Sequence, residues 1–199
     1  NRMLGTLCAL LTVTIWASWI IATRYAVTTR FSAVDIGLIR FVVPFVVLSP
    51  IWLKRGIWPQ GLPIGMGLMI AGGSGVTYSL VVATALKFAP ASHVGTLLVG
   101  AALMWACYTH ALRRSGLPAI DAAAFTGFWS FICFAVIALF TGTNIADAPL
   151  NDLLVQVVFQ GVLSGVVAVV TYGVAVRNIG STGAAAFGAL TPAFSALGG

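Results

Sequence analysis

The chain has 199 residues, of which 60% are hydrophobic and 7% are charged. Soluble domains carry about 25% charged residues, so this composition excludes an ordinary soluble globular protein. Ten Lys and Arg residues against four acidic ones give a formal net charge of +6. Because the basic residues lie mostly between apolar blocks, they indicate membrane topology rather than nucleic-acid binding.

Apolar segments recur along the chain at the length of a membrane-spanning helix, which is ~20 residues. Pro, Gly and charge clusters separate six such segments, and a seventh, incomplete one begins near Ser181. The six predicted spans are residues 4–23, 34–53, 64–86, 93–112, 122–141 and 152–176. Residues 131–140 do not alternate in polarity as barrel strands do. We therefore predict an all-α fold, a polytopic transmembrane helical bundle.

The basic residues of the connections predict the orientation of this bundle. With a cytoplasmic N-terminus, the inner side receives Arg2, Lys54, Arg55, Arg113, Arg114 and Arg177. The outer side then receives Arg24, Arg30 and Lys87. Cytoplasmic loops carry the excess of Lys and Arg. We therefore predict a multi-pass protein of the cytoplasmic (inner) membrane with its N-terminus in the cytoplasm.

An internal repeat divides the chain. At an offset of 89, WASWIIATR at residues 16–24 falls on WACYTHALR at residues 105–113. At an offset of 90, SGV at 74–76 falls on SGV at 164–166, and the small shift reflects a difference in loop length. The first pair lies on the first and fourth predicted spans, which run in opposite directions. We therefore predict two inverted repeats, residues 1–96 and 97–199, with chance similarity between apolar segments as the alternative. Inverted repeats are typical of secondary transporters, whose substrate binds near the midplane.

Several motifs resemble a known family in their order along the chain. They are the helix with Trp16 and Ala17, the span with Arg40, ALKFAPASHVG at 85–95, AALMWACYTHALRRSG at 101–116 and VTYGVAVRNIGSTGAAAFGALTPAF at 170–194. Together they resemble the EamA-like family of the drug/metabolite transporter superfamily. The resemblance implies ten helices in two inverted five-helix repeats, both termini in the cytoplasm, and transport of small metabolites or drugs.

The sequence departs from this family in length. The resemblance implies that about two helices are missing near residues 95–100 and that the chain ends inside the counterpart of the ninth helix, after Pro192. The departure leaves two interpretations. One is an alternating-access transporter of amino-acid-like or other small organic solutes, and the other is a non-functional truncated remnant. We expect the chain alone to transport poorly, because a ten-helix carrier places its site between two complete halves.

An intramembrane enzyme is the alternative from another class. It would need a nucleophile, a base and an acid at one depth, and the chain has few ionisable residues in its spans. The three cysteines have no metal-ligand spacing. We therefore expect no enzymatic activity, no cofactor and no metal, and we expect a small-molecule substrate and the lipid bilayer as partners.

Arg40 is the one formally charged residue well inside a predicted span. A charge at the centre of a membrane helix costs ~2.5–3.5 kcal/mol on insertion scales, so it usually has a function. Two interpretations remain open, namely snorkelling to the interface or contact with substrate. Pro44 lacks the N–H that would bond to the Arg40 carbonyl, so we predict a kink and a free acceptor there.

Aromatic residues at matched positions of the repeat predict the walls of a central cavity. An aromatic belt at the interface is the alternative for the tryptophans, and core packing is the alternative for the tyrosines. The predicted substrate-binding residues are Arg40, Trp16, Trp19, Tyr78, Trp105, Tyr108 and Tyr172.

Two sets of residues have structural roles in this interpretation. Asp35 and Asp121 lie near the starts of helices, where a carboxylate caps free N–H groups. Pairs of glycines four apart permit close approach of helices. These pairs are Gly61 with Gly65 and Gly161 with Gly165.

Overall fold

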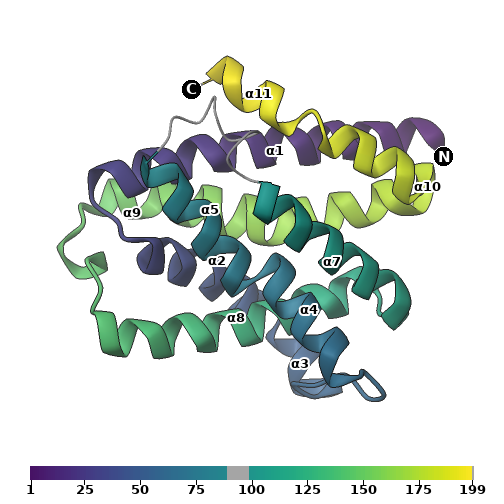
Figure 1. Cartoon of the computed structure of the whole chain (residues 1–199), viewed down its shortest axis with the longest axis horizontal. Helices are drawn as coiled ribbons and strands as arrows, with labels where there is room; N and C mark the ends of the chain where they lie inside the picture. Colours follow the sequence, from purple (N-terminus) through teal and green to yellow (C-terminus); the bar gives the residue numbers. More distant parts are fainter. Residues whose placement is uncertain (89–98, 199) are drawn as a thin grey trace.

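The computed structural model describes residues 1–88 and 99–198, and in these residues it contains helices and no strand (Figure 1). Four helical segments are long and apolar enough to cross a membrane: Arg2–Thr29 (α1), Ile64–Phe88, Ala119–Thr141 (α8) and Leu150–Gly180. A fifth forms if α2 (Ala33–Val47) and α3 (Ser49–Arg55), bent by 63° relative to each other, count as one span. The predicted all-α membrane bundle is confirmed.

The remaining helices cover the other predicted spans. The Ile64–Phe88 segment consists of α4 (Ile64–Ser74) and α5 (Val76–Phe88), and α7 spans Val99–Ser115. Near the C-terminus, α9 (Leu150–Gln156), the π-helix η3 (Val157–Val167), α10 (Ala168–Gly188) and α11 (Thr191–Gly198) follow the short η2 (Ile145–Asp147). The start of the fourth predicted span lies outside the described residues, so the full number of spans stays a prediction.

The start of α2 is fixed by the predicted cap. Ser32 Oγ accepts the N–H of Asp35 at 3.1 Å, and Asp35 Oδ2 accepts the N–H of Ser32 at 2.8 Å. Asp35 is fully buried and also accepts the N–H of Asn144 at 3.1 Å. A reciprocal pair of this kind satisfies two free donors of the helix. The cap therefore ties the start of α2 to the loop that precedes α9.

The capping prediction for Asp121 is wrong. Asp121 lies in the first turn of α8, but Pro118 holds the N-cap position and no side chain caps that helix. The carboxylate of Asp121 instead accepts a hydrogen bond from the guanidinium of Arg55, at the end of α3. An arginine within reach therefore outcompeted the backbone N–H groups for this carboxylate.

Two pairs of helices make the most extensive contacts among the described residues. Helix α1 packs on α10, and α7 packs on α4 (Figure 1). The counterparts α2 and α8 pack on each other, where the fully buried Phe134 stacks on Phe41 at 5.9 Å over Gly37. The first helices after the matched tryptophan segments thus pack on each other through their aromatic side chains.

The backbone is irregular around both Ser-Gly pairs that the predicted repeat matches. Gly75 has φ −104° and ψ −123° and separates α4 from α5. Its counterpart Gly165 lies in η3, where the helix widens from α to π geometry over eleven residues. Such wide turns are rare and mark functional segments in many proteins. The irregular backbone therefore includes both glycines that the predicted repeat matches, as a break at Gly75 and as π geometry around Gly165.

The two predicted glycine pairs differ in their packing. A Cβ at Gly161 would lie 3.2 Å from the Ile39 carbonyl oxygen and 2.8 Å from Val43 Cβ, so η3 approaches α2 closely there. Gly65 has no atom within 4 Å of a Cβ position, and Gly61 has φ +76° and lies in a turn. The prediction of close approach is therefore confirmed for the second pair and wrong for the first, in which Gly61 lies in a turn and Gly65 in the first turn of α4.

We predict that Gly161→Ala destabilises the bundle, because the added methyl group would force η3 away from α2. Overpacking of this kind costs about 1–3 kcal/mol, and each kcal/mol shifts Tm by about 2–4 °C for a chain of this size. The measurement is the thermal unfolding of the purified protein in detergent. Gly65→Ala, which adds the same methyl group to open space, should leave Tm unchanged, and equal losses for both variants would contradict this packing.

Candidate functional site

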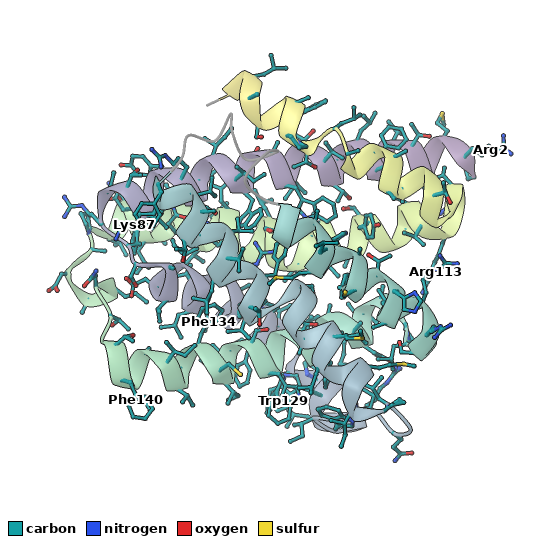
Figure 2. The ribbon with its side chains drawn as sticks, in the orientation of Figure 1. Arg2, Lys87, Arg113, Trp129, Phe134 and Phe140 are labelled. Carbon is teal, nitrogen blue, oxygen red and sulfur yellow. The ribbon has the colours of Figure 1, made fainter. Side chains whose placement is uncertain are left out.

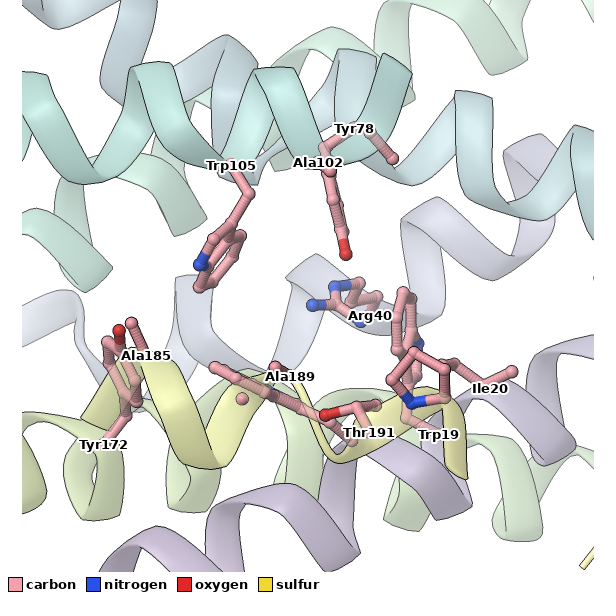
Figure 3. Close-up of a pocket in the computed structure, with 14 residues that line it drawn as sticks. Trp19, Ile20, Arg40, Tyr78, Ala102, Trp105, Tyr172, Ala185, Ala189 and Thr191 are labelled. Atoms are coloured by element: carbon pink, nitrogen blue, oxygen red, sulfur yellow. The ribbon is translucent and has the colours of Figure 1, made fainter. Parts of the chain in front are cut away.

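A cavity of about 350 Å³ lies between helices from both halves of the sequence. Six of the seven predicted site residues line it: Arg40, Trp16, Trp19, Tyr78, Trp105 and Tyr172 (Figure 3). The other described lining residues are Ile20, Ala101, Ala102, Ala185, Gly188, Ala189, Thr191 and Pro192. Most of this second group are small residues on or beside α7, α10 and α11. The sequence alone does not show whether such small residues line a cavity or pack against another helix.

The matched tryptophans of the repeat meet at the cavity. The ring centroids of Trp16, on α1, and Trp105, on α7, are 5.2 Å apart and nearly perpendicular. Trp16 also contacts Tyr172 at 5.3 Å, and Trp105 contacts Tyr78 at 5.7 Å. Edge-on and tilted rings at these distances attract each other. The aromatic residues therefore form a continuous wall contributed by α1, α5, α7 and α10.

Tyr108 lies beside this wall and does not line the cavity. Its ring packs on Trp105 at 4.9 Å, three residues back along α7. It also contacts the apolar cluster that includes Ile70 and Phe125, and a Cβ at Gly73 would lie 2.9 Å from Tyr108 Cβ. The structure therefore places Tyr108 where α7 packs on α4, and its ring supports Trp105 from behind.

Arg40 projects from α2 into the cavity (Figure 3). Its side chain is buried, with the residue 8% exposed, and its guanidinium carbon lies 4.3 Å from the centroid of the Trp19 ring. Nε and Nη1 are buried and have no hydrogen-bond partner. Removing an ion from water costs several kcal/mol even after relaxation, whereas a cation–π contact returns about 0.5–2 kcal/mol. The contact with Trp19 thus offsets only part of the cost of burial.

A chain of buried polar groups holds the Trp19 ring in place. Trp19 Nε1 donates to Gln160 Oε1 at 2.5 Å. Gln160 Nε2 in turn donates to Thr23 Oγ1 at 2.9 Å and to Gln156 Oε1 at 3.1 Å. Both glutamines are fully buried, so these bonds form where an unmade one would be costly. The network connects α9 and η3 to the face of α1 that supports Arg40.

The sequence interpretation missed Gln156 and Gln160. They are two amides four residues apart in an otherwise apolar predicted span, which places them on one face of a helix. That spacing could have identified a polar face on this span. Their partners on α1, Trp19 and Thr23, could be found only from the fold.

The backbone of α2 beside Arg40 packs closely on η3. Pro44 leaves the Arg40 carbonyl without its helical donor, as predicted. A Cβ at Gly165 would lie 3.1 Å from that carbonyl oxygen and 3.3 Å from Pro44 Cδ. The absence of a side chain at Gly165 therefore allows η3 to reach the segment of α2 that carries Arg40.

We predict that Trp19 and Gln160 are energetically coupled. Trp19→Phe and Gln160→Leu each leave a buried polar group unpaired, which costs about 1–3 kcal/mol. The double variant should lose less stability than the sum of the two, because both changes remove the same hydrogen bond. The measurement is a double-mutant cycle on the thermal unfolding of the protein in detergent.

Trp52 provides the matched control for this cycle. Its indole N–H donates to the Phe45 carbonyl oxygen at 3.1 Å, away from the glutamines. Trp52→Phe and Gln160→Leu should therefore have additive effects. Additive effects for Trp19→Phe as well would show that the network does not hold the ring.

A comparison with protein families matches residues 96–199 to the EamA-like transporter family. The match covers just over half of the chain and includes α7, with Trp105, and the helices that carry Gln160 and Tyr172. No curated protein and no solved structure matches the chain. The resemblance inferred from the order of the motifs is confirmed, and the chain belongs to the EamA-like transporter family.

Proposed function

We propose that this chain moves a small organic solute across the cytoplasmic membrane by alternating access, with the cavity around Arg40 as the solute site. Family membership and the apolar helices make it a multi-pass membrane transporter of the drug/metabolite type. The observation that carries the finer proposal is the cavity itself. It has the volume of a small-molecule site, and its walls include the matched Trp16 and Trp105.

The position of the cavity supports alternating access between residues 1–96 and 97–199. Carriers of this kind bind substrate between two repeats that move relative to each other. Helices α1, α2 and α5 contribute walls from the first segment, and α7, α10 and α11 contribute walls from the second. The interruptions at Gly75, in η3 and at Gly180 (φ 79°) are places where helices of both segments can bend.

A transporter is also favoured over an intramembrane enzyme by the chemistry of the cavity. Its described lining offers one guanidinium and the hydroxyls of Tyr78, Tyr172 and Thr191. Acid–base or nucleophilic catalysis needs a base within hydrogen-bond reach of the group that it activates. No His, Cys or carboxylate belongs to that described lining.

The distribution of basic residues supports an N-terminus in the cytoplasm. Arg2 and Arg113 lie at one end of the bundle, and Lys87 lies at the opposite end (Figure 2). Phe140, which is 86% exposed, lies on the outer surface of α8, where lipid would cover it. We therefore place the end with Arg2 and Arg113 in the cytoplasm.

The transport proposal predicts that Arg40→Lys impairs solute counterflow in liposomes while membrane insertion stays intact. A lysine keeps the charge but loses the planar fork of donors, and the loss of a charge-assisted bond should lower uptake by about tenfold. The measurement is counterflow of radiolabelled amino acids, aromatic acids and nucleosides. The exposed Arg114 offers the control Arg114→Lys, which should transport normally. Unchanged transport for both Arg40→Lys and Arg40→Ala would show that the guanidinium does not contact the solute.

The orientation predicts which side of the membrane two introduced cysteines face. Ser115 ends α7, and Thr143 follows α8. In a variant without Cys8, Cys107 and Cys133, an impermeant thiol reagent added to intact cells should label Thr143→Cys and spare Ser115→Cys. Labelling of Ser115→Cys with protection of Thr143→Cys would show that the protein has the opposite orientation in the membrane.

A further inference from the structure

We infer that the solute of this cavity is a monoanion with an aromatic or branched apolar body, a monocarboxylate in particular, and that its carboxylate pairs with Arg40. The inference rests on the proposed function, because it names the substrate class of the same cavity. It goes further in predicting the charge of the solute and in disfavouring zwitterionic amino acids. Four observations carry it.

The first observation is that, within residues 1–88 and 99–198, no acidic side chain pairs with Arg40. The chain has four acidic residues, and all of them lie at helix starts or in a connection: Asp35, Asp121, Asp147 and Asp152. Among the described residues, the two ion pairs join Asp121 to Arg55 and Asp152 to Arg30. A guanidinium stays charged at neutral pH. A group that enters the cavity can therefore supply the negative charge that the described side chains do not.

The second observation is the state of the guanidinium itself. Nε and Nη1 are buried without a hydrogen-bond partner, although the side chain lines an open cavity. Buried polar groups in native proteins are almost always paired, so unpaired ones in a cavity point to a ligand. The planar donors of arginine match the two oxygens of a carboxylate. The Trp19 ring, 4.3 Å from the guanidinium carbon, restricts the orientations that this fork can adopt.

The third observation is the apolar character of the remaining walls. The rings of Trp16, Trp105 and Tyr172 line the cavity together with the small residues Ala102 and Ala189. An aromatic or branched apolar group buried here would replace water against these surfaces. A sugar or a polyol would instead leave most of its hydroxyls without partners.

The fourth observation concerns the net charge of the solute. The described lining contains no acidic side chain that could pair with an ammonium group. The polar side chains near Arg40 are hydroxyls, which carry no charge at neutral pH. The hydroxyl of Tyr78 points toward Arg40 (Figure 3), and the buried hydroxyl of Thr191 has no hydrogen-bond partner. One guanidinium balances one negative charge. A second anionic group or an added ammonium group would therefore stay uncompensated.

The test compares four probes that share one phenyl body and differ in charge. They are 3-phenylpropionate, its neutral amide, the cation phenethylamine and the zwitterion phenylalanine. Binding to the purified protein in detergent is measured by the quenching of tryptophan fluorescence. We expect 3-phenylpropionate to bind at least tenfold more tightly than each of the other three. This comparison uses the unaltered protein and does not depend on the folding of a variant.

Two variants assign the preference to its residue. Arg40→Gln should remove the preference for the anion over the amide. Arg114→Gln removes the same charge from an exposed position and should keep the preference. Equal or tighter binding of the amide, the amine or phenylalanine to the unaltered protein would overturn the inference, and so would an unchanged preference in Arg40→Gln.

Counterflow of labelled 3-phenylpropionate in liposomes then separates this inference from the proposed function. Anion-selective binding with saturable counterflow supports both. Anion-selective binding without counterflow supports the charge of the ligand and overturns the transport proposal. Counterflow of phenethylamine or phenylalanine in preference to the anion overturns the inference and leaves the transport proposal standing.

Discussion

The burial of one guanidinium organises the centre of this protein. Arg40 sits against the Trp19 ring, and that ring is held by the amide of Gln160. A positive charge in this place is unfavourable unless something compensates it. The cation–π contact is the compensation that the chain itself provides, and the cavity gives an external group access to the same guanidinium. The geometry of the site thus follows from a charge that the fold buries without neutralising.

The bundle around this charge brings equivalent parts of the two halves together. Helices α2 and α8 pack on each other, and the matched tryptophans of α1 and α7 meet at the cavity. The glycine at residue 161 lets η3 approach α2, which brings Gln160 within reach of α1. Small residues perform this role in membrane bundles because lipid is as apolar as the side chains, so helices associate through close packing. The position of Arg40 therefore depends on the close packing of Gly161 and Gly165 against the neighbouring residues of α2.

The sequence was most informative where a physical rule acts on a short segment. The length of the apolar segments predicted the helices, and the Ser32–Asp35 box shows how a cap fixes the start of one of them. The repeated W-A motif predicted that Trp16 and Trp105 occupy related positions, and the structure brings their rings together. These features depend on local periodicity or on self-similarity, and both can be counted along a chain.

Features that depend on the three-dimensional approach of helices were not predictable in this way. The partner of Asp121 is an arginine 66 residues away, and the indole of Trp19 bonds to an amide 141 residues away. Tyr108 aligns with Trp19 in the repeat, yet it lies where α7 packs on α4 and does not line the cavity. Sequence position alone does not determine which face of an apolar helix meets lipid, a neighbour or a cavity.

The most direct test of the cavity as the transport site is the access of a thiol reagent to its wall. Ala102 lines the cavity beside Tyr78 and Trp105 (Figure 3). In a variant without the native cysteines, an impermeant reagent should modify Ala102→Cys from either side of the membrane in different transport states, and a transported solute should slow the reaction from both sides. Modification from one side only, unaffected by any transported solute, would contradict alternating access through this cavity.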